Sequence, residues 1–433
     1  MKIAVSVLVT LLLCGSLSAR ELSLARALEL ARAHSYVLKQ ARAEAEASAS
    51  LESAAERERW PTLDVSASGA YASYVPTLDL ELPFGESFSR EIGTHQNYQA
   101  DIRLLFPVYT GGRISGGIDR AEAVVRVQQA LAQANLDQVY LQTRVEYFTL
   151  ARFDQLETAA AASLRRARIT AKDVQSMYEA GVADSTDLLE ADLNLTEASF
   201  ALTQAKNMRR RSELRLLILL GLNPQDSLTL SDALVTPSVP TLPPIIADSK
   251  PELRAAEATM AMRRAERDLS HSAYLPTVSL MGGWSYGKPN LDRFNNEWND
   301  YWTVGAQISW SFNIGNKTGE QVRASTWQLR AAERQRDEVA ETLQREVQLR
   351  FEELTLALER YRSADRQWQL ARSNYRLARD RFQAGDLPSN RLLEIEQMLS
   401  SAESSRAAAA AEYHIARSAY LYALGSDQLK EGR

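Results

Sequence analysis

The sequence predicts a mainly α-helical protein that also contains four β-strands, and three observations lead to this fold class. Two stretches of about sixty-five residues, 115–178 and 318–382, are rich in helix-forming residues and contain no proline. Four shorter stretches alternate between apolar and polar residues, which is the period of a strand with one apolar and one polar face. The order of these helices and strands occurs twice along the chain.

The clearest strand covers residues 98–106. Its apolar positions fall on one side of an extended chain: Tyr98, Ala100, Ile102, Leu104 and Phe106. The polar residues between them fall on the other side. A near copy alternates in the same way up to Phe312, and each of these strands follows an earlier one, near 65–74 and 278–286. The four strands therefore come as two pairs.

Each pair of strands lies between helices. Residues 22–58 predict one helix that ends at Trp60-Pro61, and 251–273 predict its counterpart. After the first long helix, Gly181 suits a left-handed turn, and Ser185 can cap a return helix that runs to Leu220. The second long helix turns at Ala384-Gly385, and its return helix ends at Leu424-Gly425. Residues 75–97 predict a loop and 225–248 a proline-rich connector.

A duplication explains the repeated order. Turn, return helix and helix end match at one common offset of 204 residues: Ala180-Gly181 with Ala384-Gly385, Leu188–Glu190 with Leu392–Glu394, and Leu220-Gly221 with Leu424-Gly425. We therefore expect a first structural repeat over 20–224, the connector over 225–248, and a second repeat over 249–433.

Residues 1–19 have the composition of a secretory signal peptide. Lys2 precedes a short apolar run, and small residues follow before Ala19. Lipidation of Cys14, the only cysteine, is the alternative. Removal of the signal leaves no thiol and hence no disulfide. The formal net charge of −5 argues against a nucleic-acid partner.

The strands predict contact with lipid. Each is about ten to twelve residues long, enough to span a bilayer when tilted, and aromatic residues lie near their ends: Tyr71, Tyr74, Trp284, Tyr286, Tyr301 and Trp302. Four strands cannot close a barrel alone, so several copies must contribute to one. A small soluble sandwich is the alternative, but it gives no reason for helices about 95 Å long.

The chain resembles the TolC family of outer membrane efflux ducts over essentially its whole mature length. The resemblance rests on the duplicated plan, the strand exit Phe106–Gly112, and the hairpin tip Tyr178–Gly181 with Asp187–Glu190. It implies a homotrimer in the outer membrane, with a twelve-stranded β-barrel, a periplasmic α-helical tunnel and a belt formed by the connector and the C-terminus. It also implies a periplasmic adaptor and an inner-membrane pump of the RND or ABC type as partners, in efflux or type I secretion.

The family closes its inner mouth with residues just after the second hairpin tip. Its pattern of Tyr, Gly, Arg and two acids corresponds here to Phe382, Gly385, Leu387, Arg391 and Glu394. Two bonding groups are thus missing, and one acid is replaced by a base. We expect Arg391 to pair with Asp187 or Glu190 of the first repeat, beside Thr186, and Glu394 to form a ring across three copies. Unpaired, mutually repelling arginines or a plain solvated face are the alternatives.

The two hairpin tips are the expected docking points for the adaptor, at Gly181-Val182 and Gly385-Asp386. An enzyme is not expected, because the four histidines are scattered and no nucleophile, phosphate-binding or metal-binding motif occurs. We likewise expect no cofactor. A periplasmic coiled-coil adaptor or scaffold is the alternative function, but it leaves the four amphipathic strands unexplained.

Overall fold

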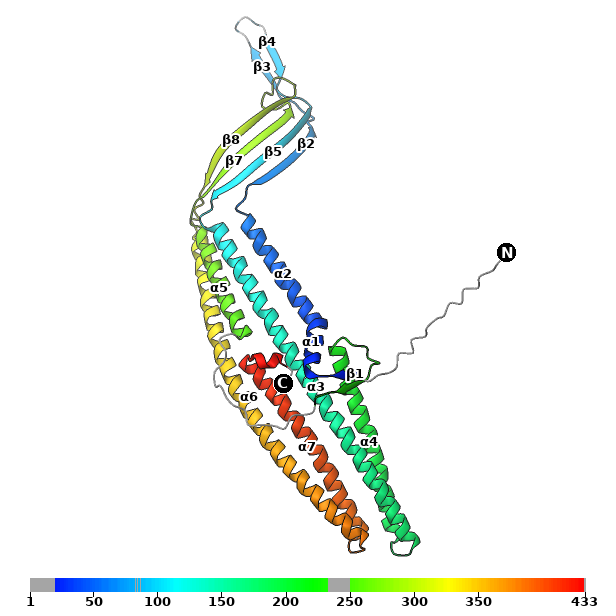
Figure 1. The fold of residues 1–433 in the computed structure, drawn as a ribbon. Helices are drawn as coiled ribbons and strands as arrows, with labels where there is room; N and C mark the ends of the chain where they lie inside the picture. The colour runs from blue at the N-terminus through cyan, green and yellow to red at the C-terminus, as the bar shows by residue number, and fades with distance from the viewer. Residues whose placement is uncertain (1–19, 82, 84, 86, 233–249, 432–433) are drawn as a thin grey trace, which may run out of the picture. The chain divides into compact units, whose positions relative to one another are not determined.

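The structure, a computed structural model, describes residues 20–81, 83, 85, 87–232 and 250–431 (Figure 1). The predicted signal peptide, Cys14 and most of the proline-rich connector lie outside the described residues. The chain divides into two compact units. We call them the strand unit, residues 42–130 and 254–338, and the helical unit, residues 1–41, 131–253 and 339–433.

The strand unit contains a four-stranded antiparallel sheet in the order β2-β5-β7-β8 (Figure 1). The strands are β2 (Thr62–Tyr71), β5 (Gln96–Tyr109), β7 (Thr277–Lys288) and β8 (Asn299–Ser309). The first two lie within the first predicted repeat and the last two within the second predicted repeat. The β5–β7 pairing therefore joins the two repeats within one sheet.

The strand register confirms the predicted alternation. One row across the sheet pairs Val65 with Ile102, Ile102 with Trp284, and Trp284 with Trp302, so all four residues lie on one face. The adjacent row on the opposite face consists of Ser66, Asp101, Ser285 and Tyr301. One face of the sheet is thus apolar and the other polar, across all four strands.

Two predictions about the strands were wrong. The segment 75–97 is not a plain loop, because it contains a hairpin of β3 (Thr77–Glu81) and β4 (Ser87–Glu91). Pro76 precedes this hairpin, and Gly85 (φ 84°) lies in its turn. Both residues disfavour a strand, but neither lies inside β3 or β4, so the two strands can form. The fourth strand ends at Ser309 and does not reach Phe312. Beyond it, the Trp310 indole donates to the carbonyl of Tyr274 at 3.0 Å.

The helical unit is built from two antiparallel hairpins. The first consists of α3 (Arg113–Glu179) and α4 (Ser185–Leu219), and the second of α6 (Lys317–Gln383) and α7 (Ser389–Leu424); the first parts of α3 and α6 belong to the strand unit. Within the helical unit the helices follow the order α6-α7-α3-α4 (Figure 1). Each neighbouring pair is joined by an ion pair: Asp365–Arg406, Glu403–Arg166 and Asp154–Arg209.

None of the helices in the described part of the chain combines the length and the apolar character that crossing a bilayer requires.

The first helix is not continuous, contrary to the prediction. It is divided at Ser35, whose ψ of 120° is not helical, into α1 (Leu24–His34) and α2 (Tyr36–Arg57). A Cβ on Gly221 would lie 2.8 Å from the Cβ of His34, so the end of α1 packs against the end of α4. Glycine is needed there because φ is also positive, at 66°.

The second repeat has the corresponding junction. The helix α5 (Pro251–Ser272) begins beside the end of α7, where the buried Lys250 ammonium donates to the carbonyl of Ala423 at 3.3 Å. The Tyr422 hydroxyl donates to Glu252 at 3.0 Å. In both predicted repeats, a shorter helix begins or ends where the return helix of the hairpin stops.

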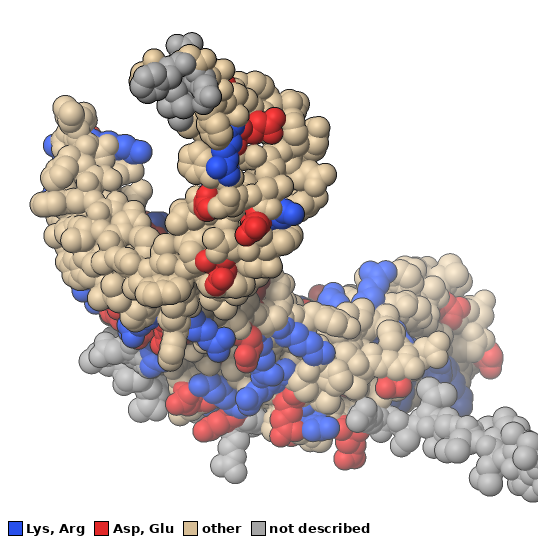
Figure 2. All heavy atoms as spheres, turned by 90° about the horizontal axis from the view of Figure 1, so that it is seen from above, with Lys and Arg blue, Asp and Glu red and all other residues tan. Residues whose placement is uncertain are grey.

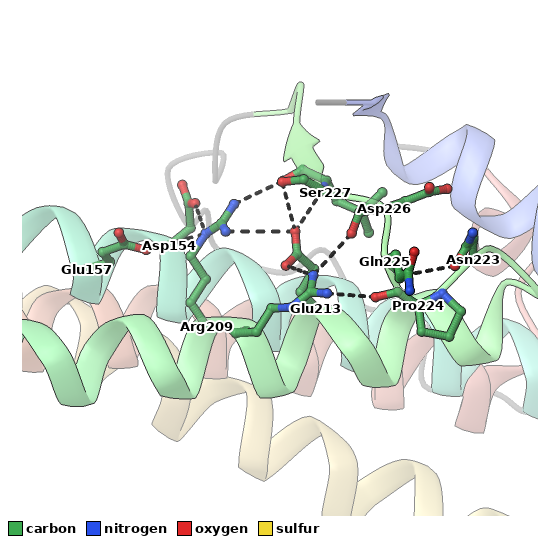
Figure 3. Close-up of polar contacts among 11 residues, drawn as sticks. Asp154, Glu157, Arg209, Glu213, Asn223, Pro224, Gln225, Asp226 and Ser227 are labelled. Carbon is green, nitrogen blue, oxygen red and sulfur yellow. Dashed lines mark hydrogen bonds and ion pairs between the residues drawn. The ribbon is translucent and has the colours of Figure 1, made fainter. Parts of the chain in front are cut away.

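Arginines hold the non-helical segments onto the helices. Arg209 and Arg210 of α4 donate to the carbonyls of Leu228 and Pro224 at 2.9 and 2.7 Å, and Glu213 accepts from the Leu228 amide at 2.7 Å (Figure 3). These bonds place the strand β6 (Leu228–Leu230), which pairs in parallel with β1 (Arg20–Leu22). The start of the connector is therefore fixed to the hairpin.

The C-terminal segment is fixed by one buried side chain. Arg144 of α3 donates to the carbonyls of Leu429, Gln428 and Glu431, at 2.9 and 2.8 Å for the first two. The short helix η1 (Asp427–Lys430) thereby packs on the hairpin. Burial lowers the pKa of Arg144 to about 10, so the side chain stays charged at neutral pH.

Candidate functional site

The tips of the two hairpins have the same backbone geometry. Gly181 and Gly385 have φ values of 74° and 82°, so both sequence-predicted glycines occupy the left-handed conformation that ends a helix. Both are exposed, as are Val182 and Asp386 beside them. Each tip therefore presents a small, accessible turn.

The N-cap of α4 is Asp184, not Ser185 as predicted. The Asp184 carboxylate accepts from the amides of Thr186 and Asp187 at 2.7 and 3.0 Å, and the Asp187 carboxylate accepts from the Asp184 amide at 3.2 Å. This reciprocal arrangement is a capping box, in which a carboxylate also suits the positive end of the helix dipole. Asp184 occupies the N-cap position because Ser185 is already the first residue of the helix.

The two tips are bound to each other through Asp187. The Ser389 hydroxyl at the start of α7 donates to the Asp187 carboxylate. Behind this contact lies an apolar cluster from all four helices, with Leu387 packed at its side: Ala171, Val174, Ala191, Ala378, Phe382, Leu392 and Ile395. Phe382 and Leu387, two of the predicted gate residues, therefore pack between the hairpins.

The predicted pairing of Arg391 with Asp187 or Glu190 is not formed within the chain. The Arg391 guanidinium instead donates to Glu394, three residues later on the same exposed face of α7. Asp187 is occupied by the Asp184 amide and the Ser389 hydroxyl. An exposed pair at this spacing contributes little to stability.

A polar cluster lies between α3 and α7, next to the apolar one. Arg166 of α3 donates to both oxygens of Glu403, at 2.8 and 3.3 Å, and to the Ser400 hydroxyl at 3.1 Å. One turn further toward the tips, the Thr170 hydroxyl donates to Glu396 at 2.8 Å. These side chains hold the two hairpins together by charge-assisted hydrogen bonds.

Glu396 is almost completely buried, with 4% of its surface exposed, and its second carboxylate oxygen has no hydrogen-bond partner in the described structure. Burial raises the pKa of Glu396, and the hydrogen bond from Thr170 and the charge of Arg166 partly oppose this shift. The Tyr375 hydroxyl nearby also has a raised pKa, mainly because of burial.

Sequence reasoning missed Ser389, Arg166 and Glu396. A signal for Glu396 existed, because it follows Leu392 and precedes Leu399 on the buried stripe of α7. A carboxylate within such a stripe requires a partner across the helix contact. Nothing in the sequence identified that partner, since the neighbouring helix is fixed only by the fold.

The apolar face of the sheet is the second candidate site. Its side chains are solvent-exposed in the single chain; Val65, Trp302, Val304 and Ile308 are between 72 and 76% exposed. Figure 2 shows Asp, Glu, Lys and Arg side chains scattered over this view of the chain. Within the described chain, β2 and β8 each pair along one edge only. Both the face and the edges therefore lack partners.

Among the residues that the structure describes, no group of three or more His, Cys, Asp or Glu is arranged to hold a metal ion.

Comparison with known proteins assigns the chain to a family. The family model described as "Outer membrane efflux protein" matches residues 27–222 and 242–426, which is most of the sequence. The chain belongs to the outer membrane efflux protein family. The resemblance predicted from the hairpin tips and the duplicated plan is thereby confirmed, and so is the localisation in the outer membrane.

One curated protein is also similar to part of the chain. Protein CyaE of Bordetella pertussis is 25% identical over 281 residues, which are 63% of this chain and 57% of that protein. The chain thus matches little more than half the length of this curated relative.

Solved structures confirm the fold of this efflux protein. The CmeC outer membrane channel of Campylobacter jejuni is 17% identical with a TM-score of 0.77, covering 93% of this chain and 85% of its own. The outer membrane protein VceC of Vibrio cholerae is 15% identical with a TM-score of 0.77, covering 93% and 96%. The predicted class, long helical hairpins with membrane strands, is confirmed.

Proposed function

We propose that three copies of this chain form an outer membrane duct, the exit channel of a tripartite efflux or type I secretion system. The observation that carries this proposal is the sheet, which has one continuous apolar face and two unpaired edges. An unpaired edge in lipid leaves backbone groups without hydrogen bonds, which costs several kcal/mol per group. Closure of β8 of one copy on β2 of the next removes every edge.

The helical hairpins complete the duct. In a closed trimer, twelve strands form the barrel, and the four hairpin helices of each copy form a tunnel in the periplasm. The alternative, a periplasmic adaptor or scaffold, is less consistent with the apolar face of the sheet. The family and fold are those of channels, and we propose no catalytic activity and no cofactor for this chain.

We further propose that a periplasmic adaptor docks at the two hairpin tips and links the duct to an inner-membrane pump of the RND or ABC type. Both tips are exposed glycine turns without a close neighbour on the glycine. Lipid is the partner of the apolar sheet face.

Replacing Gly385 with Val should abolish export while the trimer forms at its normal level. A Cβ at Gly385 meets no atom within 4 Å, so the change acts only by straining a backbone with φ of 82°. Export of a reporter substrate by cells that contain the cognate pump measures the effect. Gly117→Val on α3, where a Cβ also meets nothing and φ is ordinary, is the control. Normal export by Gly385→Val would place docking away from the tips.

The gate is proposed at the contact between the hairpins. Asp187, Phe382 and Leu387 hold the tips together, while Thr186, Glu190 and the Arg391–Glu394 pair are proposed to line the mouth. This arrangement predicts that the purified protein inserts into planar bilayers and conducts weakly.

Ser389→Ala removes only the hydroxyl that joins α7 to Asp187, so the single-channel conductance should rise severalfold. Ser401→Ala, an exposed position on α7, should leave it unchanged. Absence of any channel activity in the wild type would overturn the proposed duct. An unchanged conductance in Ser389→Ala would overturn only the gate.

A further inference from the structure

One carboxylate lies where the four hairpin helices pack together near the tips. Glu396 of α7 is only 4% exposed. Side chains of the other three helices face it or lie close to it: Arg166 and Thr170 of α3, Asn194 of α4, and Tyr375 and Arg379 of α6. All of them belong to the helical unit. An acid in the middle of a helix contact is costly when it is ionised.

The ionised form of Glu396 is only half satisfied by hydrogen bonds. One carboxylate oxygen accepts from the Thr170 hydroxyl at 2.8 Å. The other oxygen is buried and has no hydrogen-bond partner in the described structure. A buried acceptor without a partner carries its full cost of desolvation, and the cost is larger when the group is charged. Protonation of the carboxylate removes the charge and lowers this cost.

The two nearby arginines do not form an ion pair with this acid. The Arg166 guanidinium binds both oxygens of Glu403 and lies 5.7 Å from the centre of the Tyr375 ring. In the part of the chain that the structure describes, no ion pair joins Glu396 to Arg166 or Arg379. Their charges act on Glu396 from a distance and favour the ionised form, but burial outweighs them, and the pKa of Glu396 is raised.

Glu396 is coupled to the tips through the packing of α7. It lies two helical turns, about 10 Å, from Ser389 along the helix. Between them, Leu392 and Ile395 belong to the apolar cluster that also contains Phe382. A force that moves α7 away from α3 at Glu396 therefore also acts on the contact between Ser389 and Asp187.

The counterpart of Glu396 in the first predicted repeat has a different environment. The offset of 204 residues relates Glu396 to Asp192 of α4, and both acids follow the first residue of their helix by two turns. Asp192 is exposed in the single chain. The two return helices thus carry an acid at the same distance from their start, but only the acid of α7 is buried in the contact between the hairpins.

We infer that Glu396 is a proton-binding site that controls the contact between the two hairpins. With the proton bound, the neutral acid remains in the contact and the inner mouth stays closed. Loss of the proton places a charge there, and the charge is best hydrated when α7 moves away from α3. This inference rests on the proposed duct and concerns its regulation: acid closes the mouth.

The direction of the pH effect follows from the raised pKa in the closed state. The neutral acid stabilises the closed contact at low pH, and this contribution is lost as the pH rises through the closed-state pKa. In planar bilayers, the wild-type protein should therefore conduct severalfold more at about pH 8 than at about pH 5. Equal conductance at the two values, or a lower one at the higher pH, would overturn the inference.

Glu396→Gln keeps the size of the side chain and removes its charge. This variant should show the low conductance of the acid state at both pH values. Asp192→Asn is the matched control, since it removes an exposed acid at the same distance from the start of its helix, and it should keep the pH dependence of the wild type. A pH dependence that persists unchanged in Glu396→Gln would overturn the inference.

Thr170→Val separates a proton site from a purely structural role. The Thr170 hydroxyl donates to the carboxylate and favours its ionised form. Valine has a similar shape but no hydroxyl, so the closed-state pKa of Glu396 should rise further. The midpoint of the conductance change should then move to higher pH, in a trimer of normal yield. A midpoint that stays in place or moves to lower pH would contradict proton binding at Glu396.

A distance measurement tests the switch without relying on a channel. Spin labels at Arg168→Cys of α3 and Gln397→Cys of α7, both exposed positions, report the separation of the two helices in detergent. The distance should be longer at the higher pH, and Glu396→Gln should abolish the change. A pH-dependent distance without conductance at any pH supports the proton site and overturns the duct. Normal conductance with a distance that does not vary with pH overturns the proton site alone.

Discussion

Replacing Val304 with Arg is expected to remove most of the protein from the outer membrane. Val304 lies at the centre of β8, is 76% exposed and shares the apolar face with Leu104 of β5. A cation on the lipid side of a membrane strand costs about 2–4 kcal/mol near the midplane. Each of the three copies would bring one such arginine into the same barrel, so the free-energy costs of the three add up against assembly.

Gln307→Arg is the matched control, since Gln307 lies on the same strand but on the polar face. Its arginine would face the lumen and remain hydrated. Outer-membrane fractionation and the yield of folded trimer measure both variants. Equal tolerance of the two arginines would mean that the faces of the sheet are assigned wrongly.

Replacing Arg166 with Ala is expected to weaken the contact between the hairpins by about 2–4 kcal/mol, somewhat less than the loss of one partner from a fully buried ion pair. The side chains of Arg166 and Glu403 are 13 and 19% exposed. Without Arg166, the Glu403 carboxylate would remain largely buried and would have lost this ion pair. The midpoint of thermal unfolding, followed by helical circular dichroism in detergent, measures the loss. Arg168→Ala, at an exposed position of α3, should change it little.

The stability lost on replacing Arg166 with Ala should be larger at about pH 8 than at about pH 5. The folded-state pKa of Glu396 is raised, mainly by burial, so its contribution to stability is greatest below the unfolded pKa and is lost as the pH rises through the folded value. Arg166 opposes the shift, and its removal raises the folded pKa further. Glu396→Gln in the Arg166→Ala background should remove this pH dependence. A deficit that does not vary with pH would exclude Glu396 as its source.

Periodicity and duplication predicted much of the fold. The bounds of α3, α6 and α7 differ from those expected by only a few residues, because proline-free stretches and positive-φ glycines define them locally. The faces of the strands were predicted for the same reason, since alternation is a property of neighbouring residues. The break at Ser35 was not predicted, because it occurs where α1 packs against Gly221, far away in the sequence.

The candidate site was predicted less well. The glycine turns were found because their conformation is local. The predicted pairing of Arg391 with Asp187 or Glu190 stays a prediction for the assembled protein; within the single chain, the Arg391 side chain pairs with Glu394, three residues away. The Arg166–Glu403 contact depends on the packing of α3 against α7, which no local pattern specifies.

The β5–β7 pairing has a consequence for assembly. Strands β2 and β5 come from the first half of the chain, and β7 and β8 come from the second half. The β5–β7 pairing therefore joins the second strand of the first half to the first strand of the second half. In the proposed trimer, β8 pairs antiparallel with β2 of the next copy, as β5 pairs with β7 within one copy. The barrel then consists of six similar strand pairs, two from each chain. Covalent linkage of the halves reduces a six-body association to a three-body one. Each association costs several kcal/mol of translational and rotational entropy, so the duplicated chain closes the same ring at a lower concentration.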